Sequence, residues 1–455
     1  ISAKEVGEST IDGSNIKLYL TKLNGSEEEP LMTPETYHEE SEENTYTGRP
    51  AGEMSLYKGS MNSSENNNYR LRMYVDENYN PQGDGGGLTF SVRINVYGLA
   101  GEKYVPETTK TILAANPVQE EKTNMFNYAS NGSYISSFTS SGPTYGNEPS
   151  QVTNGLFEAE DEDGVSYYFR GNVENNNVQF GEYTSDYYVY DDGYGDYYQS
   201  QESCEEAENS ICSQVKLASA GDKMYWKIVR VNGDSSLRLI YNGISATPDN
   251  SDLAHSYSIG VTPYNLSRND PKYAGYTYDN GTDSFIKREV DTWYQNTLGK
   301  SNYDRMVTSG RFCSDSSGYQ DGSAFGGGNV FASMIRLGQI MTNFASPNAP
   351  TLKCPATSES YGGSYRLKAG LITADELALA GESMYVTGNN SFLHPNNVSF
   401  WYFTITPASR QVWRSGADLA EAGTLSGDIR PVINVTTDNG FASGDGSVES
   451  PYVIE

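Results

Sequence analysis

Apolar and polar residues alternate strictly in three stretches near the beginning of the chain. A period of two residues puts every second side chain on the same face of a β-strand, so each stretch predicts a strand with one buried face. The apolar positions are Ile16, Leu18, Leu20; Tyr69, Leu71, Met73, Val75; and Leu88, Phe90, Val92, Ile94, Val96. We expect these strands to form an all-β, jelly-roll-like sandwich over residues 1–115.

Longer apolar and aromatic runs predict strands in the second part of the chain. They cover residues 155–173, 224–241 and 429–435. Within the second run, Asn232 and Gly233 can supply the positive φ angles of a tight turn, which predicts a β-hairpin. In the third run, residues 432–435 follow the pair Arg430-Pro431 and are expected to form a core strand.

Two short helices are predicted in the same part of the chain. Apolar residues recur at helical spacing over residues 285–298, and either Asp283 or Ser284 can cap the start of that helix. A second helix is expected to begin at Thr373, which forms a capping box with Glu376. These helices and the strands around them predict an α+β domain over residues 155–455.

The segment between the two predicted domains has a different composition. Residues 116–154 have few aliphatic side chains and many turn formers. We therefore expect a linker or a long ordered loop between a sandwich domain and an α+β domain. The fold class predicted for the whole chain is mainly β.

The overall composition favours a secreted protein. The 455 residues include 36 Tyr and 46 Gly, which is typical of extracellular β-proteins with many turns. The chain contains 31 Lys and Arg and 59 Asp and Glu, which gives a formal net charge of −28 and argues against nucleic-acid binding. No apolar run is long enough to span a membrane. We interpret Ile1 as an N-terminus left by processing or by trimming.

The four cysteines predict disulfides. They are Cys204, Cys212, Cys313 and Cys354. No two of them form a Cys-x-x-Cys motif and none has a histidine near it in sequence, which argues against a zinc-binding site. Three pairings are possible. We favour the local one, which joins the first cysteine to the second and the third to the fourth.

The sequence gives no signature of catalysis. It has no Gly-x-Ser-x-Gly elbow, and its three histidines, His38, His255 and His394, are scattered. A glycosidase carboxylate pair has no spacing signature, so the sequence neither supports one nor rules one out. Isopeptide cross-links are conceivable in a chain rich in Lys, Asn and Asp, but no sequence pattern supports them. We predict that the protein is not an enzyme.

Calcium is the one cofactor for which the sequence offers ligands. Asp191, Asp192 and Asp196 lie in a short Gly-broken loop, and Asp161 with Asp163 resembles the start of a calcium loop. Calcium takes six to eight oxygen ligands, and carboxylates with backbone carbonyls can supply them. A solvated acidic loop is the alternative interpretation.

Aromatic residues near the C-terminus are candidates for ligand recognition. Trp401, Tyr402, Arg410 and Trp413 flank a predicted turn, where aromatic and polar side chains can meet a sugar or a protein. The alternative is that these aromatic side chains belong to the core.

The C-terminal part resembles a known module. The stretches GLITADELALAG (370–381), WYFTITPASRQVWRSG (401–416), IRPVINV (429–435) and SGDGSVESPYVIE (443–455) follow in this order. In this order they resemble the C-terminal module of exported proteins from Gram-positive and related gut bacteria. The resemblance implies a divergent C-type-lectin fold of the formylglycine-generating-enzyme type. The paired catalytic cysteines of those enzymes have no counterpart here, so no active site is implied.

The N-terminal part is similar to the TasA/camelysin-like fibre and matrix proteins. The similarity lies in NNNYRLRMYVDEN (66–78) and LTFSVRINVYG (88–98). It implies that an N-terminal strand of one subunit completes the sheet of its neighbour. The residues that would do so here are Ile1, Ser2, Ala3, Val6 and Ile11. A frayed tail is the alternative interpretation of this segment.

We therefore expect a secreted structural protein, located extracellularly or at the cell surface. It would be a subunit of a fibre or surface layer and would assemble with itself by β-strand exchange. The alternative function is a monomeric adhesin or lectin-like protein that binds a host or matrix glycan or a protein.

Overall fold

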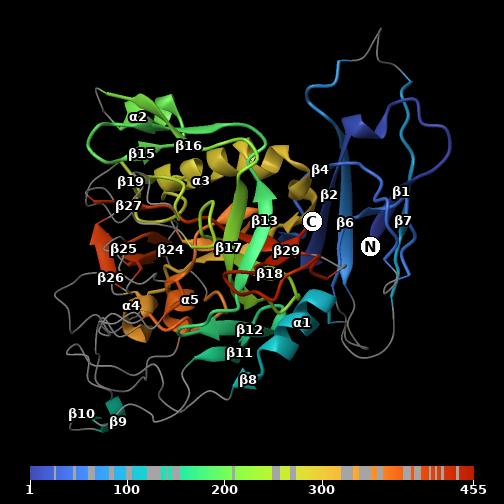
Figure 1. Cartoon of the computed structure of the whole chain (residues 1–455). Coiled ribbons are helices and arrows are strands. Elements are labelled where there is room, and N and C mark those ends of the chain that lie inside the picture. Colours follow the sequence, from blue (N-terminus) through green and yellow to red (C-terminus); the bar gives the residue numbers. More distant parts are fainter. Residues whose placement is uncertain are drawn as a thin grey trace. The chain divides into compact units, whose positions relative to one another are not determined.

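The computed structural model divides the chain into two compact units, Ile1–Val105 and Pro106–Glu455 (Figure 1). The structure describes residues 1–24, 27–44, 48–59, 67–80, 87–98, 105–119, 135–139, 142–145, 154–207, 211–247, 257–266, 273–318, 331–337, 350–355, 362–382, 391–393, 401–408, 411–415, 418–421, 425–436 and 440–455. Both units are built mainly of strands with few short helices, which confirms the mainly-β fold class.

The first unit is a small sandwich of two sheets. Its strands are β1 (Ser2–Glu5), β2 (Ile16–Asn24), β3 (Glu27–Pro30), β4 (Glu35–Thr36), β5 (Met54–Ser55), β6 (Asn68–Val75) and β7 (Val92–Asn95). One sheet has the order β5-β1-β7, and the other has β2 at its centre, with β6 along one side and β3 and β4 along the other. Both sheets contribute to one core, whose buried residues are Ala3, Ile11, Ile16, Leu18, Leu20, Met32, Tyr37, Met54 and Leu56.

The alternating pattern is satisfied fully on β2 and only partly on β6 and β7. Met73 pairs with the buried Leu18, so it faces the core, yet it is 47% exposed. Ile94 pairs with the buried Ala3 and is 41% exposed, and Val96 beyond it is 76% exposed. The predicted buried face of residues 88–96 is therefore largely uncovered. Among the described strands, β7 lies at the edge of its sheet and has a neighbouring strand on one side alone.

The second unit is built on a ten-stranded sheet. Its main path has the order β20-β28-β18-β17-β12-β11-β8. Beside this path, β13 pairs with both β17 and β29, and β23 pairs with β28. These strands are β8 (Val118–Gln119), β11 (Gly155–Asp161), β12 (Gly164–Arg170), β13 (Asn177–Glu182), β17 (Lys223–Val231), β18 (Leu237–Tyr241), β20 (Val307–Thr308), β23 (Ala369–Gly370), β28 (Val432–Val435) and β29 (Tyr452–Ile454).

Smaller sheets surround this one. A five-stranded sheet has the order β16-β14-β15-β19-β27, and a three-stranded sheet has the order β24-β25-β26. In addition, β9 pairs with β10 and β21 pairs with β22. The strands are β9 (Ile135–Thr139), β10 (Gly142–Tyr145), β14 (Tyr187–Asp191), β15 (Tyr197–Tyr198), β16 (Ser213–Ala218), β19 (Val261–Pro263), β21 (Gly310–Ser314), β22 (Gly363–Leu367), β24 (Phe403–Ala408), β25 (Gln411–Arg414), β26 (Asp418–Glu421) and β27 (Ser426–Asp428).

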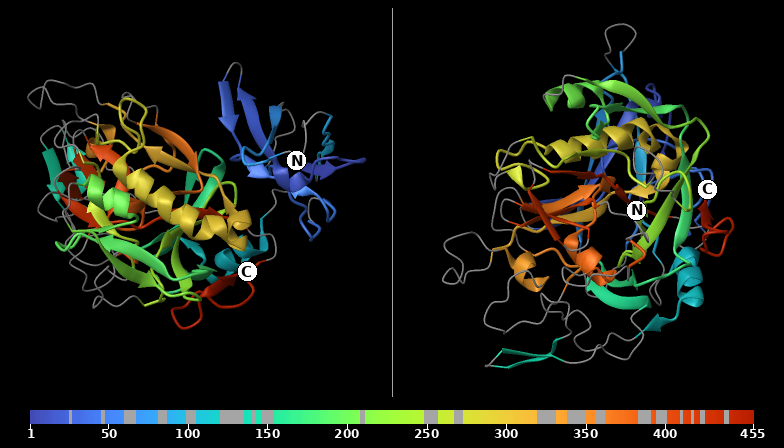
Figure 2. Two further views of the ribbon diagram at one scale, coloured as in Figure 1. Left: turned by 90° about the horizontal axis from the view of Figure 1, so that it is seen from above. Right: turned by 60° about the vertical axis from the view of Figure 1, so that its left-hand side comes forward.

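The described part of the second unit contains five α-helices: α1 (Glu107–Ala115), α2 (Gln201–Glu206), α3 (Phe285–Asn296), α4 (Ala332–Arg336) and α5 (Ala374–Leu379). The two helices predicted from the sequence are α3 and α5. The Ser284 side chain caps α3, and Thr373 with Glu376 forms the predicted capping box of α5. Figure 2 shows α3, the longest helix, lying along the unit.

The region around residue 115 differs from the sequence interpretation. The compact units divide at Val105 and Pro106, and α1 follows this division. Its Ile112 is fully buried in the core of the second unit. Part of the segment predicted as linker or loop is a strand, because β8 pairs with β11.

The predicted hairpin is formed by β17 and β18, but its turn differs from the expected one. The residue with a positive φ angle is Ser235, at 71°, and not Gly233. The glycine is needed for a different reason. Its backbone N–H donates to Asp161 at 2.8 Å, and a Cβ atom at this position would collide with the same side chain.

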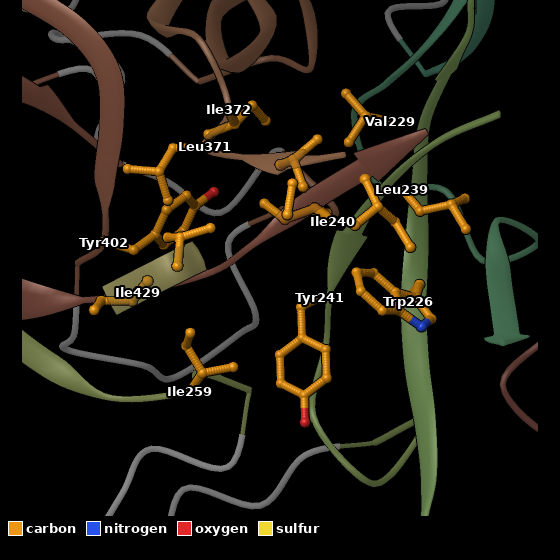
Figure 3. Close-up of a cluster of buried hydrophobic side chains, with 14 of the residues drawn as sticks. Trp226, Val229, Leu239, Ile240, Tyr241, Ile259, Leu371, Ile372, Tyr402 and Ile429 are labelled. Carbon is orange, nitrogen blue, oxygen red and sulfur yellow. The ribbon is translucent and has the colours of Figure 1, made fainter. Parts of the chain in front are cut away.

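Aromatic and aliphatic side chains fill the core beside this hairpin (Figure 3). Trp226 and Tyr241 come from the two paired strands, and their rings lie 5.3 Å apart between centroids. Trp293 of α3 contacts both rings and is fully buried. This contact joins the helix to the sheet.

The cysteines form two disulfides, Cys204–Cys212 and Cys313–Cys354. This is the local pairing favoured from the sequence. Within the residues that the structure describes, no helix is long and apolar enough to cross a membrane.

Candidate functional site

The predicted self-assembly segment is part of the sandwich of its own chain. β1 lies between β5 and β7 and pairs antiparallel with both. Ala3 is opposite Met54 on one side and Ile94 on the other. Within the described sheet β1 is therefore the central strand, and it leaves no free edge there.

Polar contacts also hold β1 in place. The Ser2 hydroxyl donates to the Glu53 carboxylate at 2.5 Å, and both residues are buried. Glu53 accepts further hydrogen bonds from Asn95 at 3.0 Å and Tyr97 at 2.8 Å. Burial acts to raise the pKa of Glu53, but the hydrogen bonds outweigh it, so the pKa lies below its usual range.

The segment that follows β1 is less tightly held. Val6 donates its N–H to Ser91 and Thr10 donates to Thr89, but Gly7 and Glu8 between them are exposed. Gly7 has a φ of +78°, a conformation that favours glycine. Ile11 beyond it is buried in the core. Of the five predicted assembly residues, Ser2, Ala3 and Ile11 are thus buried within their own unit, while Ile1 and Val6 are half-buried.

The three candidate calcium ligands lie around one loop, where the Asp196 carboxylate accepts a hydrogen bond from Ser426 and the other two carboxylates accept backbone N–H groups of the loop. Asp191 accepts the N–H of Gly193, and Asp192 accepts those of Tyr194 and Asp196. The described residues include no group of three His, Cys, Asp or Glu side chains arranged to hold a metal. Calcium binding stays a prediction.

The candidate ligand-binding aromatics are mostly core residues, so the expectation of an aromatic recognition surface needs correction. Trp413 is fully buried in a cluster with Phe331 and Met334, and Tyr402 is 2% exposed. Trp401 is half-buried, with the Arg414 guanidinium 4.5 Å from its ring centroid. Arg410 lies outside the described residues, as do His255 and His394.

A buried ionic cluster forms the most concentrated charged site in the described part of the second unit. Arg230 lies 2.7 Å from Asp161 and 3.0 Å from Glu376, and Arg238 lies 2.5 Å from Glu376. All four side chains are less than a tenth exposed. The neighbouring arginines hold the pKa of Glu376 below its usual range although burial alone would raise it.

This cluster borders a cavity of about 30 Å³. The lining includes Arg311 and both cysteines of the Cys313–Cys354 disulfide. A cavity of this size can hold a water molecule. The cavity has no room for an organic substrate as it stands.

The sequence pattern does not predict this cluster, because both arginines lie within the strands of the expected hairpin. One signal was available: Arg230 lies in the otherwise apolar stretch of residues 228–231, and Arg238 in that of residues 237–241. Charges in such strands need a buried counterion. The Glu376 of the predicted capping box is that counterion, but the sequence does not show that these residues meet.

Comparisons with known proteins do not assign the chain to a family. Scans against protein-family models, curated proteins and solved structures found no match. The inference of a function therefore depends on the chain's own sequence and geometry.

Proposed function

We propose that the protein is a secreted structural protein, a subunit of an extracellular fibre or surface layer that assembles by exchange of β1. Two disulfides fit an oxidising environment outside the cytosol. The strongly acidic composition supports solubility of a large assembly. The similarity of the N-terminal part to fibre proteins motivates the same proposal.

The position of β1 carries the proposal. It is a short strand paired on both sides, and its Ala3 side chain is fully buried. The same pairing and burial are regained if β1 of one subunit leaves and the β1 of a neighbour enters. Exchange of identical elements therefore builds contacts between subunits without needing a new surface.

The segment after β1 supports such an exchange. Gly7 and Glu8 are both exposed, and a Cβ atom added at Gly7 would meet no other atom within 4 Å. A change of backbone direction here disturbs little packing. We infer that this segment is the hinge about which β1 turns toward a neighbouring subunit.

A pair of cysteines across β1 and β7 tests the exchange. Lys4 lies directly opposite Arg93, and opposite residues of antiparallel strands are close enough for a disulfide. In Lys4→Cys/Arg93→Cys, oxidation of assembled protein should give covalent multimers on a non-reducing gel. Oxidation that gives only monomers cross-linked within one chain would contradict the proposal.

A second pair provides the matched control. Lys17 and Tyr74 are opposite each other on β2 and β6 of the same unit. Neither strand exchanges in the proposal, so Lys17→Cys/Tyr74→Cys should form its disulfide within one chain. Multimers from both variants would indicate non-specific oxidation.

A further inference from the structure

Lys227 and Asn177 form an unusual contact in the second unit. They are directly opposite on the paired strands β17 and β13, so their side chains share one face of the sheet. The Lys227 Nζ atom donates to Asn177 Oδ1 at 2.5 Å. Asn177 is 1% exposed, and its Nδ2 group donates to the backbone oxygens of Glu174 and Gly446, each at 2.8 Å. The amide is therefore held with its oxygen towards the amine.

The electrostatic surroundings differ from those of an ordinary surface lysine. On the same two strands, Lys223 forms an ion pair with its register partner Glu182. Lys227 forms no ion pair with a carboxylate among the described residues, and the charge that acts on its pKa is the like charge of Arg430. Burial, together with that arginine, lowers the pKa of the Lys227 amine to about 8. A sizeable fraction of the amine is therefore neutral, and so nucleophilic, in mildly alkaline solution.

We propose that Lys227 and Asn177 are a site of covalent modification, at which Nζ and the Asn177 side chain join in an intramolecular isopeptide bond. The Nζ lone pair attacks Cγ, a new C–N bond forms, and the bond from Cγ to Nδ2 breaks. One Nζ proton moves to Nδ2, which leaves as ammonia. No oxidant, reductant or further reactant is needed.

The folded chain supplies what such a reaction needs. The register of β13 and β17 holds the reacting groups together, which replaces a bimolecular encounter by a local one. Two backbone carbonyls fix the orientation of the amide. Lys227 is half-buried, which removes part of the water that would otherwise solvate the amine. The product would tie two neighbouring strands of the large sheet, and it is independent of any exchange of β1.

Mass spectrometry of the intact chain tests the proposal. The wild-type protein, folded and incubated at mildly alkaline pH, should be lighter than its sequence by about 17 Da, the mass of ammonia, after its two disulfides are taken into account. Tryptic digestion should yield residues 171–216 joined to residues 224–230, because cleavage after Lys227 is blocked. A wild-type mass equal to that of the sequence would overturn the proposal.

Variants separate this bond from other losses of ammonia, such as imide formation at an asparagine. Lys227→Arg keeps the positive charge and should show no mass deficit, and Asn177→Ala should likewise show none. Lys300→Arg is the matched control, because Lys300 contacts Asn296 at 2.9 Å on an exposed helix surface. It should retain the deficit. A deficit that survives in Lys227→Arg refutes the isopeptide bond, and the joined tryptic peptide decides the matter if a variant does not fold.

Discussion

Glu289 lies on the buried side of α3. It is fully buried, and only its Oε2 atom has a backbone partner, the N–H of Gln199 at 2.7 Å. The Oε1 atom has no hydrogen-bond partner within the described residues. Burial is the main reason that the pKa of this carboxyl is raised to about 7. At the scale of single residues, this is the strongest candidate for a pH-dependent effect on stability.

The raised pKa predicts the direction of that effect. The folded state binds the Glu289 proton more tightly than the unfolded state, so the free energy of unfolding falls as pH rises from about 4.5 to about 7. Glu289→Gln removes this penalty and should be more stable than wild type by about 3 kcal/mol at pH 8, with little difference at pH 4. Denaturant titrations at both pH values measure the difference.

An exposed acid on the neighbouring helix gives the control. Glu202 of α2 is exposed, so Glu202→Gln should change stability equally little at both pH values. If Glu289→Gln behaves like this control, the carboxyl is not desolvated in the folded protein.

Residue-level roles were only partly predictable from the sequence. Capping by Ser284 and Thr373 depends on residues a few positions away, so local signals were sufficient. The burial of Trp413 depends on Phe331 and Met334, far away in the chain. The pairing of Lys227 with Asn177 likewise depends on strand register, which one sequence does not show.

At the scale of elements, the alternating pattern predicted where strands occur, but it did not predict which other elements cover their apolar faces. β2 follows the predicted alternation, because each face of a strand has its own environment, whereas β6 follows it only in part. The exposure of Ile94 and Val96 depends instead on which strands lie beside β7. The hairpin was predicted from Gly233, yet that glycine is required by its close approach to Asp161.

The two disulfides should contribute unequally to stability. Cys313–Cys354 spans 41 residues and Cys204–Cys212 spans 8. In the loop-entropy description the longer loop stabilises by about 4 kcal/mol and the shorter by about 2.5 kcal/mol. Replacing both cysteines of the longer loop by serine should therefore lower the midpoint of denaturant unfolding further than the same change in the shorter loop. Equal losses, or a larger loss from the shorter loop, would contradict this ranking.

At the scale of the whole molecule, each unit has its own core and its own kind of stabilisation. The first unit combines two small sheets with partly uncovered edge strands, and it contains no disulfide among its described residues. The second unit has a large sheet, a buried ionic cluster and both disulfides. This division is consistent with an assembling N-terminal unit and a stable C-terminal unit.

Electron microscopy of the purified chain, with and without residues 1–12, tests assembly through β1. We expect regular filaments or sheets from the full chain and none from the shortened one, because the exchanged strand is missing. Far-UV circular dichroism and an unchanged unfolding transition of the second unit would show that the shortened chain is otherwise folded. Dispersed monomers in both samples, or equal assemblies in both, would contradict assembly through β1.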